Sequence, residues 1–193
     1  MAESSNIYRL TQKTKVFSGK VFGIETHELE YPGGLVQQRE IVTTSGGAVI
    51  VPMLANGDLI FISQYRAPIQ DFIVEFPAGK LEPRETPLQC ARRELQEETG
   101  YDAATFQDLA SIYTTPGFCD EILHIFLARG LKKLAEGQSL EPGESGLTVH
   151  ILPMHEALQR ARDNLISDAK TLCGLFYTEM LLRTEKTTSQ DTQ

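Results

Sequence analysis

Glutamates gather in the stretch GKLEPRETPLQCARRELQEETG, which runs from Gly79 to Gly100. Four of its five glutamates, Glu85, Glu94, Glu97 and Glu98, lie around what we predict to be one short helix. Like charges one helical turn apart each cost roughly a few tenths of a kcal/mol, so the arrangement weakens the fold unless a cation lies among the carboxylates. Three carboxylates on one helix beside a glycine turn form an all-oxygen ligand set suited to Mg²⁺ or Mn²⁺.

Such a ligand set also indicates the substrate and the chemistry. Mg²⁺ keeps several waters and shares its ligands with substrate phosphates. Bound ions polarise a phosphoryl oxygen and lower the pKa of a bound water, which predicts hydrolysis of a phosphoanhydride. The alternative is a solvated acidic helix face. Against it stand Arg93, placed to pair with a carboxylate, and Gly79, where we expect the loop to turn tightly.

One helix should present these acids. Thr86 and Gln89 form a capping box around Pro87, and Gly100 is a typical stop signal. The predicted helix therefore runs from Pro87 to Thr99, with the acids displaced from its apolar stripe and facing a cleft or solvent. The stripe packed in the core is predicted to be Leu88, Ala91 and Leu95.

The surrounding elements predict an α+β fold with a mixed sheet. Residues 14–42 alternate in the manner of a small meander of strands, either a separate sheet or a sheet edge. Asn56 and Gly57 favour a hairpin between two apolar strands. The remaining expected strands are FIVEFPAGK, LASIYTT, EILHIFLARGL and LTVHILP, and the expected helices are MHEALQRARDNL and SDAKTLCGLFYTEMLLR.

Composition narrows the class of protein. The chain has 193 residues, 41% of them hydrophobic, which is enough for one domain with a core, or one domain with a small appendage. A net charge of -8 without a basic run argues against long nucleic acid as a partner. Three scattered cysteines without a CxxC suggest neither a disulfide framework nor a zinc site. The start MAESSNIYRL does not resemble a signal peptide and no apolar run could cross a bilayer, so we expect a cytoplasmic protein without a membrane partner.

The glutamate-rich stretch resembles the signature of the Nudix hydrolase family: Gly, five residues, Glu, seven residues, then Arg-Glu-Leu-x-Glu-Glu-x-Gly. The usual aliphatic residue that follows is Tyr101 here. The resemblance implies a Nudix α/β/α sandwich and about two or three Mg²⁺ ions, with Mn²⁺ as a substitute. The implied metal ligands are the backbone carbonyl of Ala78 and the carboxylates of Glu94, Glu97 and Glu98, and the implied architectural residues are Gly79, Glu85 and Arg93.

Segments on either side of the signature, QYRAPIQDFIVEFPAGKLE and YTTPGFCDE with its Pro116, resemble the ADP-ribose and ADP-sugar pyrophosphatase branch of that family, over about Phe17 to Leu182. This branch implies that Arg66 contacts phosphates and that Phe22 stacks on adenine. The other implied substrate contacts are Arg39, Glu40, Thr115 and Glu121. Arg39 could equally be a strand-surface residue, Thr115 a turn former and Phe22 a core residue.

The same branch implies a general base on the loop GQSLEPGESGLTV. The candidates are Glu141 and Glu144, and we prefer Glu144 because it lies closer to the following strand. Many relatives carry two adjacent acids where this chain has Gly143, Glu144 and Ser145. The predicted catalytic residues are Glu144, Glu141 and Glu97.

The sequence therefore predicts an N-terminal antiparallel β subdomain over residues 1–43, a Nudix hydrolase domain over 44–184 and a disordered tail over 185–193. The expected protein is a homodimer that exchanges its N-terminal subdomain. It should hydrolyse ADP-ribose or a related nucleoside diphosphate sugar to a nucleoside monophosphate and a sugar phosphate. The rivals are preference for another sugar nucleotide such as GDP-mannose or a UDP sugar, a ligand sensor without catalysis, and a purely structural acidic domain.

Overall fold

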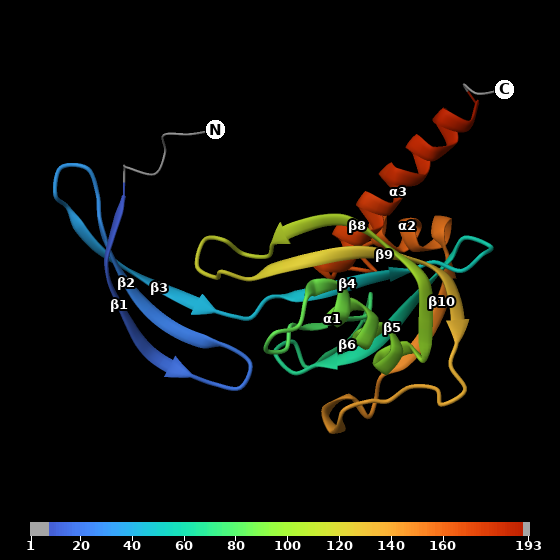
Figure 1. Cartoon of the computed structure of the whole chain (residues 1–193), viewed down its shortest axis with the longest axis horizontal. Helices are drawn as coiled ribbons and strands as arrows, with labels where there is room; N and C mark the ends of the chain where they lie inside the picture. The colour runs from blue at the N-terminus through green and yellow to red at the C-terminus, as the bar shows by residue number, and fades with distance from the viewer. Residues whose placement is uncertain (1–7, 191–193) are drawn as a thin grey trace. The chain divides into compact units, whose positions relative to one another are not determined.

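The protein is seen here in a computed structural model that describes residues 8–190 (Figure 1). The chain forms two compact units. Unit 1 contains the described residues up to Gly46 together with Tyr113–Ile122, and unit 2 contains Gly47–Ile112 and the chain from Leu123 onward. The start of the chain that was compared with signal peptides lies mostly outside the described residues. Among those that are described, no helix is both long and apolar enough to span a membrane.

Unit 1 is built on a three-stranded antiparallel sheet in the order β1-β2-β3. Its strands are β1 (Arg9–Ser18), β2 (Gly23–Glu30) and β3 (Val36–Thr43). Gly33 and Gly34 take positive φ angles of 89° and 83° in the turn between β2 and β3, a conformation that glycine adopts without strain. The predicted antiparallel meander is confirmed, and it begins at Arg9 instead of Thr14 because Arg9 pairs with Glu30 across the sheet.

Unit 2 holds two further sheets and the helices. One sheet has the order β7-β4-β9-β8, with β4 parallel to β9 and antiparallel to β7; the other is antiparallel in the order β10-β5-β6. The strands are β4 (Gly47–Pro52), β5 (Asp58–Arg66), β6 (Asp71–Glu75), β7 (Ala78–Lys80), β8 (Tyr101–Tyr113), β9 (Ile122–Lys133) and β10 (Thr148–Pro153). The helices are α1 (Pro87–Glu94), η1 (Leu95–Thr99), η2 (Pro142–Glu144), α2 (Met154–Arg162) and α3 (Ala169–Gln190).

Strand β4 is buried on both faces and separates two cores. Ala48 and Ile50 belong to a cluster with residues of α1, whereas Val49 and Val51 belong to a second cluster with residues of α2 and α3. Successive side chains of a strand point to opposite faces, so the apolar run GAVIVP packs against helices on both sides. The expected α/β/α sandwich with a mixed sheet is confirmed.

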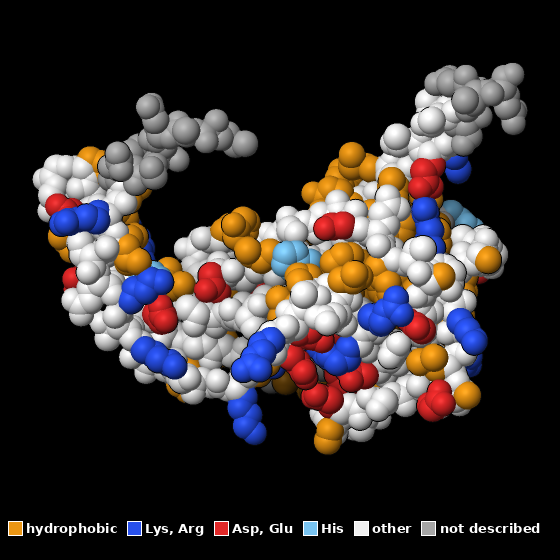
Figure 2. Space-filling model, in the orientation of Figure 1, with side chains coloured by type: hydrophobic (Ala, Val, Ile, Leu, Met, Phe, Trp, Pro, Cys, Tyr) orange, Lys and Arg blue, Asp and Glu red, His pale blue; other side chains and the backbone are white. Residues whose placement is uncertain are grey.

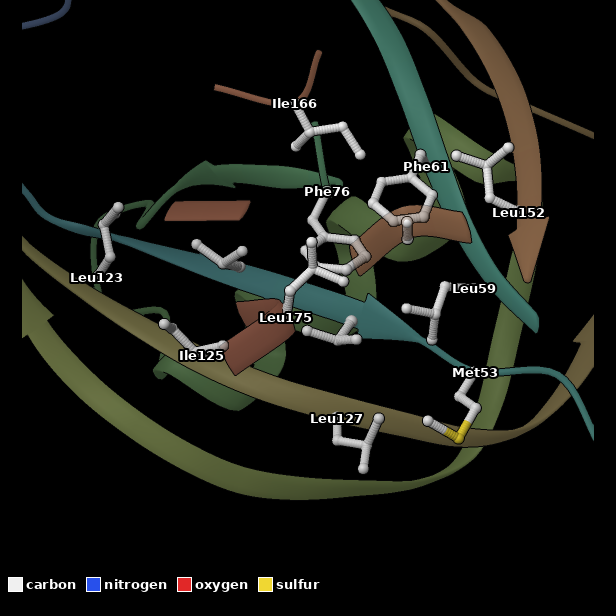
Figure 3. Packing of buried hydrophobic residues seen from close by; sticks show 13 residues of the cluster. Met53, Leu59, Phe61, Phe76, Leu123, Ile125, Leu127, Leu152, Ile166 and Leu175 are labelled. Carbon is white, nitrogen blue, oxygen red and sulfur yellow. The ribbon is translucent and has the colours of Figure 1, made fainter. Parts of the chain in front are cut away.

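The larger core lies between this sheet, β5 and α3 (Figure 3). Phe61 and Phe76 stack there with ring centroids 4.5 Å apart, and both side chains are fully buried. A Cβ added at Gly174 in α3 would lie 3.0 Å from Phe76 and from Val51, so glycine lets the helix approach the sheet closely. This packing fixes the strand end that precedes the glutamate-rich stretch.

Three local predictions differ from the structure. Leu88 is 47% exposed, and Cys90 is buried in its place, because the face of α1 that packs on the sheet is rotated toward Cys90, Ala91 and Leu95. Asn56 and Gly57 make the expected turn, and Met53 pairs with Leu59 next to it, but β4 and β5 belong to different sheets.

The C-terminal segment also differs. Helix α3 continues to Gln190 through most of the tail that was predicted to be disordered, and residues 191–193 lie outside the described part of the chain. An ion pair of 2.9 Å joins Arg129 to Glu185, and the hydroxyl groups of Thr184 and Thr187 donate to carbonyls one turn earlier. These contacts extend the helix beyond its apolar part.

Candidate active site

Helix α1 begins at the capping box that the sequence indicated. The backbone N–H of Gln89 donates to the hydroxyl of Thr86 at 3.3 Å, and the amide oxygen of Gln89 accepts from the backbone N–H of Thr86 at 2.9 Å. Pro87 occupies the first turn, where its missing N–H costs nothing. The start of the acidic helix is therefore fixed by its own sequence.

The last turn of this helix is a π-helix, η1, and not the continuous α-helix that the spacing predicted. The Thr99 hydroxyl donates to the carbonyl of Leu95, and Gly100 ends the turn with a φ of 72°. Single π turns are rare and often occur at functional sites. No sequence signal distinguishes this turn from an α-helical one, which is why the change of pitch was missed.

Arg93 lies at the centre of the acidic cluster. Its guanidinium donates to Glu85 at 2.9 Å, to Glu94 at 2.6 Å and to Glu97 at 3.1 Å. The hydrogen bonds with Glu85 raise the pKa of Arg93 and lower that of Glu85. The carbonyl of Lys80 also accepts from Arg93, so one side chain ties α1 to β7 and to the loop between them.

A glycine is needed at position 79 because there is no room for a side chain, and not because the chain turns tightly there. It lies in β7, and a Cβ added there would fall 1.6 Å from Oε1 of Glu94. Any larger residue would therefore displace the Glu94 carboxylate. The sequence located the glycine, but the reason for it is visible only when strand and helix are seen packed together.

Two of the predicted ligands are buried, contrary to the expectation that all the acids face a cleft or solvent. Glu98 is 2% exposed and Glu94 is 7% exposed, whereas the Glu97 side chain is 36% exposed. Burial, followed by the charge of Glu94, raises the pKa of Glu98 to about 9. Burial also raises the pKa of Glu94 to about 7, in spite of Arg93. Ionising both acids is therefore unfavourable without an added cation.

The donor set fits a hard divalent cation. Oε2 of Glu98 accepts from the backbone N–H of Ala78 at 2.8 Å, and within the described part of the chain Glu98 has no ion pair. Carboxylate and carbonyl oxygens are the ligands that Mg²⁺ and Mn²⁺ prefer. No three His, Cys, Asp or Glu side chains of residues 8–190 are gathered as a ready metal centre; Arg93 holds Glu94 and Glu97 in this structure.

Acidic side chains on unit 2 gather with Lys and Arg side chains among them on the face that carries α1 (Figure 2).

The segment after β9 is hydrogen-bonded to the acidic helical segment. The backbone N–H of Ser139 donates to the carbonyl of Glu97 at 2.9 Å, and the side chain of Gln138 donates to the carbonyl of Glu98. Sequence reasoning missed both residues, because a polar loop gives no signal of what its amides contact.

The two candidate bases lie in a short turn on that loop, η2. Oε2 of Glu144 accepts from the backbone N–H of Glu141 at 3.0 Å. The charge of Glu144 contributes to the raised pKa of both Glu94 and Glu98, and Glu141 is not among the causes of either shift. Of the two candidates, Glu144 therefore has the larger electrostatic effect on the buried carboxylates.

Arg66 lies at the end of β5, where its guanidinium forms a bidentate pair with Glu75. Nε donates at 2.9 Å and Nη2 at 2.7 Å, and Lys170 donates to the same carboxylate. The sequence singled out Arg66 but missed Glu75 and Lys170. The signal for Glu75 was an acid inside the apolar strand FIVEF, where an unpaired charge would be costly.

The other predicted substrate contacts lie in unit 1 and are described there alone. Phe22 is 43% exposed, so it is not a core residue; its ring centroid lies 5.9 Å from that of Phe17. Arg39 donates to the Tyr31 hydroxyl at 2.6 Å. Glu40 is exposed on β3. The carbonyl of Thr115 accepts hydrogen bonds from backbone N–H groups of the turn that follows it, and the carbonyl of Glu121 accepts one from the backbone N–H of Thr114. Arg66, Glu144 and the acidic helix all belong to unit 2, where β5, which carries Arg66, packs against η1.

Comparisons with known proteins agree with this geometry. The profile of the NUDIX domain matches residues 44–172. The chain is 39% identical to an ADP-ribose pyrophosphatase of Bacillus subtilis over 87% of this chain and 90% of that protein. It is 38% identical to a methanol dehydrogenase activator of Bacillus methanolicus over 88% and 92%. It is 34% identical to a GDP-mannose pyrophosphatase of Yersinia enterocolitica over 77% and 81%.

A solved structure shows the same fold. The crystal structure of an ADP compounds hydrolase superposes with a TM-score of 0.81, covering 95% of this chain and 98% of that one at 24% identity. The superposition includes nearly the whole of both chains, and it supports the arrangement of elements described above.

Proposed function

Because this chain belongs to the NUDIX domain family and is a Nudix pyrophosphohydrolase, we propose that it hydrolyses the pyrophosphate of ADP-ribose or a related nucleoside diphosphate sugar with Mg²⁺. The products are a nucleoside monophosphate and a sugar phosphate. The observation that carries the proposal is the pair of buried carboxylates of Glu94 and Glu98, whose pKa values are raised and whose helical segment packs against β5, the strand of Arg66. Such a cluster is poised to accept cations together with a diphosphate.

The proposed ligands for about two or three Mg²⁺ ions are the carbonyl of Ala78 and the carboxylates of Glu94, Glu97 and Glu98. When bound, Mg²⁺ or Mn²⁺ neutralises the diphosphate and acidifies water. Gly79, Glu85 and Arg93 hold the ligands in place through the contacts described above. Arg66 grips a phosphate oxygen with the guanidinium edge that Glu75 leaves free.

Glu144 is the proposed general base, which takes a proton from the attacking water. Its charge contributes to the raised pKa values of Glu94 and Glu98, which supports this choice. Glu97 is the most exposed of the three helical acids. It is the proposed catalytic acid of the helix, because a water bound to its metal ion would be accessible to the substrate. Glu141 caps the same turn and remains the second candidate.

A matched pair of variants separates the two candidates. We expect Glu144→Gln to lower kcat about 10² to 10⁴-fold, because a general base typically contributes that much, while KM changes little. Glu141→Gln serves as the control and should keep kcat within about threefold. Steady-state rates at saturating Mg²⁺ and ADP-ribose provide the comparison. An equal loss in both variants, or a larger loss in Glu141→Gln, would remove Glu144 from this role.

The proposed base and sugar contacts come from unit 1. Phe22 offers an exposed ring for stacking on adenine, which is worth about 1 to 3 kcal/mol and accepts any base. Arg39, Glu40, Thr115 and Glu121 are the proposed contacts to the phosphates and the terminal sugar. No residue among these reads adenine alone, and the relatives include pyrophosphatases of both ADP-ribose and GDP-mannose.

The test is a comparison of kcat/KM for ADP-ribose, ADP-glucose, GDP-mannose and NADH with Mg²⁺, with products separated by chromatography. The proposal expects ADP-ribose to give the largest value. A larger value for GDP-mannose would favour the second candidate, which the 34% identical GDP-mannose pyrophosphatase supports. Tight binding without cleavage of any of the four would favour a ligand sensor.

We further propose that residues 1–43 act as a subdomain that a homodimer exchanges, next to a hydrolase domain over 44–184, in the cytoplasm. The sheet of unit 1 supports a covering partner. All ten residues of β1 are exposed, and no apolar side chain among the described residues of unit 1 is buried. A second copy of the chain would cover Leu10, Val16 and Phe17. Sedimentation equilibrium should give twice the monomer mass, and a monomer at micromolar concentration would contradict the exchange.

A further inference from the structure

Charged side chains of alternating sign run from β5 to the first turn of α3. Glu75, at the end of β6, is 0% exposed. Its carboxylate accepts from Arg66 on one side and from Nζ of Lys170 on the other. Nζ of Lys170 also donates to Oδ2 of Asp168 at 3.0 Å. A buried carboxylate persists only when it is paired and hydrogen-bonded, and here two cations share it.

The far end of this series is fixed by the cap of α3. Oδ2 of Asp168 accepts from the backbone N–H of Thr171 at 3.0 Å and from its hydroxyl at 2.7 Å. The Thr171 hydroxyl in turn accepts from the backbone N–H of Phe76 at 2.8 Å. Phe76 directly follows Glu75, and its ring is locked against Phe61. The position of Lys170 is therefore determined by the helix cap and by the core.

The near end of the series faces the acidic helix. Strand β5, which carries Arg66, packs against η1, which carries Glu98. Burial lowers the pKa of Arg66, but the hydrogen bonds and charge of Glu75, with smaller contributions from Asp168 and Glu98, raise it above its ordinary value. Among the described residues, Nη1 of Arg66 has no hydrogen-bond partner, and the side chain is 38% exposed. The outer edge of the guanidinium is thus available to a ligand.

We propose that Lys170 is a positioning residue that holds Glu75 so that Glu75 fixes the guanidinium plane of Arg66 toward the phosphates of the substrate. Both cations bond Oε2 of Glu75, so this oxygen is restrained from two sides. Without Lys170 the carboxylate keeps a partner on one side alone, and it rotates together with Arg66. The inference rests on the proposed function in one respect, the contact of Arg66 with phosphate.

Kinetics of Lys170→Met test the positioning. We expect KM for ADP-ribose to rise about tenfold while kcat stays within about threefold, because a phosphate grip of this kind acts on ground state and transition state alike. Lys170→Arg, which keeps the charge, should restore KM to within about threefold of the wild-type value. Lys133→Met, an exposed lysine of β9, is the matched control and should change neither constant.

A double-mutant cycle separates positioning from a general loss of stability. In the Arg66→Ala background, Lys170→Met should raise KM no further, since a residue that acts through Arg66 has nothing left to position. Additive increases in KM, together with a lowered Tm, would assign Lys170 a purely structural role and overturn the inference. If Lys170→Met does not fold, Lys170→Gln is read in the same way.

A measurement that needs no substrate tests the positioning role of Lys170 separately from the proposed function. The NMR signal of the Arg66 Nε–H group, identified by its loss in Arg66→Ala, should be sharp in the wild type and in Lys170→Arg. It should broaden in Lys170→Met as the guanidinium begins to rotate. An equally sharp signal in all three proteins overturns the positioning role, whether or not ADP-ribose is cleaved. Cleavage of ADP-ribose by the wild type with KM unchanged in Lys170→Met also overturns it and leaves the proposed function intact.

Discussion

Glu98→Gln is expected to lower kcat/KM at least about 10³-fold while the protein stays folded. Activity should be lost without loss of the fold because the Glu98 side chain is buried. Glu98 is 2% exposed and its pKa is raised to about 9, so without metal its side chain carries a proton at neutral pH. Glutamine has nearly the same shape as a protonated glutamate, so the fold tolerates it. The lost anionic oxygen removes a proposed Mg²⁺ ligand, and activity is lost with it.

The matched control for this variant is Glu136→Gln, which alters an exposed acid in the segment after β9. Its kcat/KM should stay within about twofold of the wild-type value, because the exposed Glu136 carboxylate makes no hydrogen bond or ion pair within the described residues and has no proposed ligand role. Circular dichroism and Tm confirm that both variants are folded. Full activity of Glu98→Gln in Mg²⁺ would remove Glu98 from the metal site.

The metal-free protein is expected to lose stability as pH rises from about 5 to 9. The folded state keeps protons on Glu94 and Glu98 up to pKa values of about 7 and about 9, whereas the unfolded chain releases them near the ordinary value of 4.5. The folded state therefore binds more protons over this range, and the free energy of unfolding falls as pH rises. At about 1.4 kcal/mol per pKa unit, the shift of Glu94 alone, from 4.5 to about 7, corresponds to a loss on the order of 3 kcal/mol.

Mg²⁺ should reverse much of this loss, because a bound cation stabilises the ionised carboxylates of the folded state alone. Chemical denaturation at several pH values, in EDTA and in Mg²⁺, measures both effects. Glu98→Gln in EDTA is the internal control, since it should lose the part of the slope between about pH 7 and 9 and keep the part that belongs to Glu94. A wild-type free energy of unfolding that is flat over this range in EDTA would contradict the raised pKa values.

Much of unit 2 could be predicted because its signals are local. The cap at Thr86 and the stop at Gly100 set the ends of the acidic helical segment, and each depends on residues within a turn of it. The apolar run of β4 indicated a strand, and the structure buries it on both faces. The positions of Glu94, Glu97 and Glu98 on one helix followed from the same pattern, without knowledge of any other element.

What the sequence could not show depends on contacts between distant segments. Glu75 and Lys170 are 95 positions apart, and only the folded chain brings Lys170 to that carboxylate. The burial of Glu98 beside Ala78 likewise depends on how β7 packs against η1. Leu88 was placed in the core because its spacing fits the apolar stripe, but the helix is rotated so that Cys90 is buried. The spacing of apolar residues predicts that one face of a helix is buried, but which residues lie on that face depends on the sheet against which the helix packs.

The central claim is that the acidic cluster on α1 and η1 supports metal-dependent hydrolysis of a nucleoside diphosphate sugar. The most direct measurement is product analysis by chromatography after the wild-type protein is incubated with ADP-ribose, once in Mg²⁺ and once in EDTA. The account predicts equimolar AMP and ribose 5-phosphate in Mg²⁺ and no cleavage in EDTA. Cleavage at the same rate in EDTA, or an intact substrate in Mg²⁺ while no other sugar nucleotide is cleaved, would contradict it.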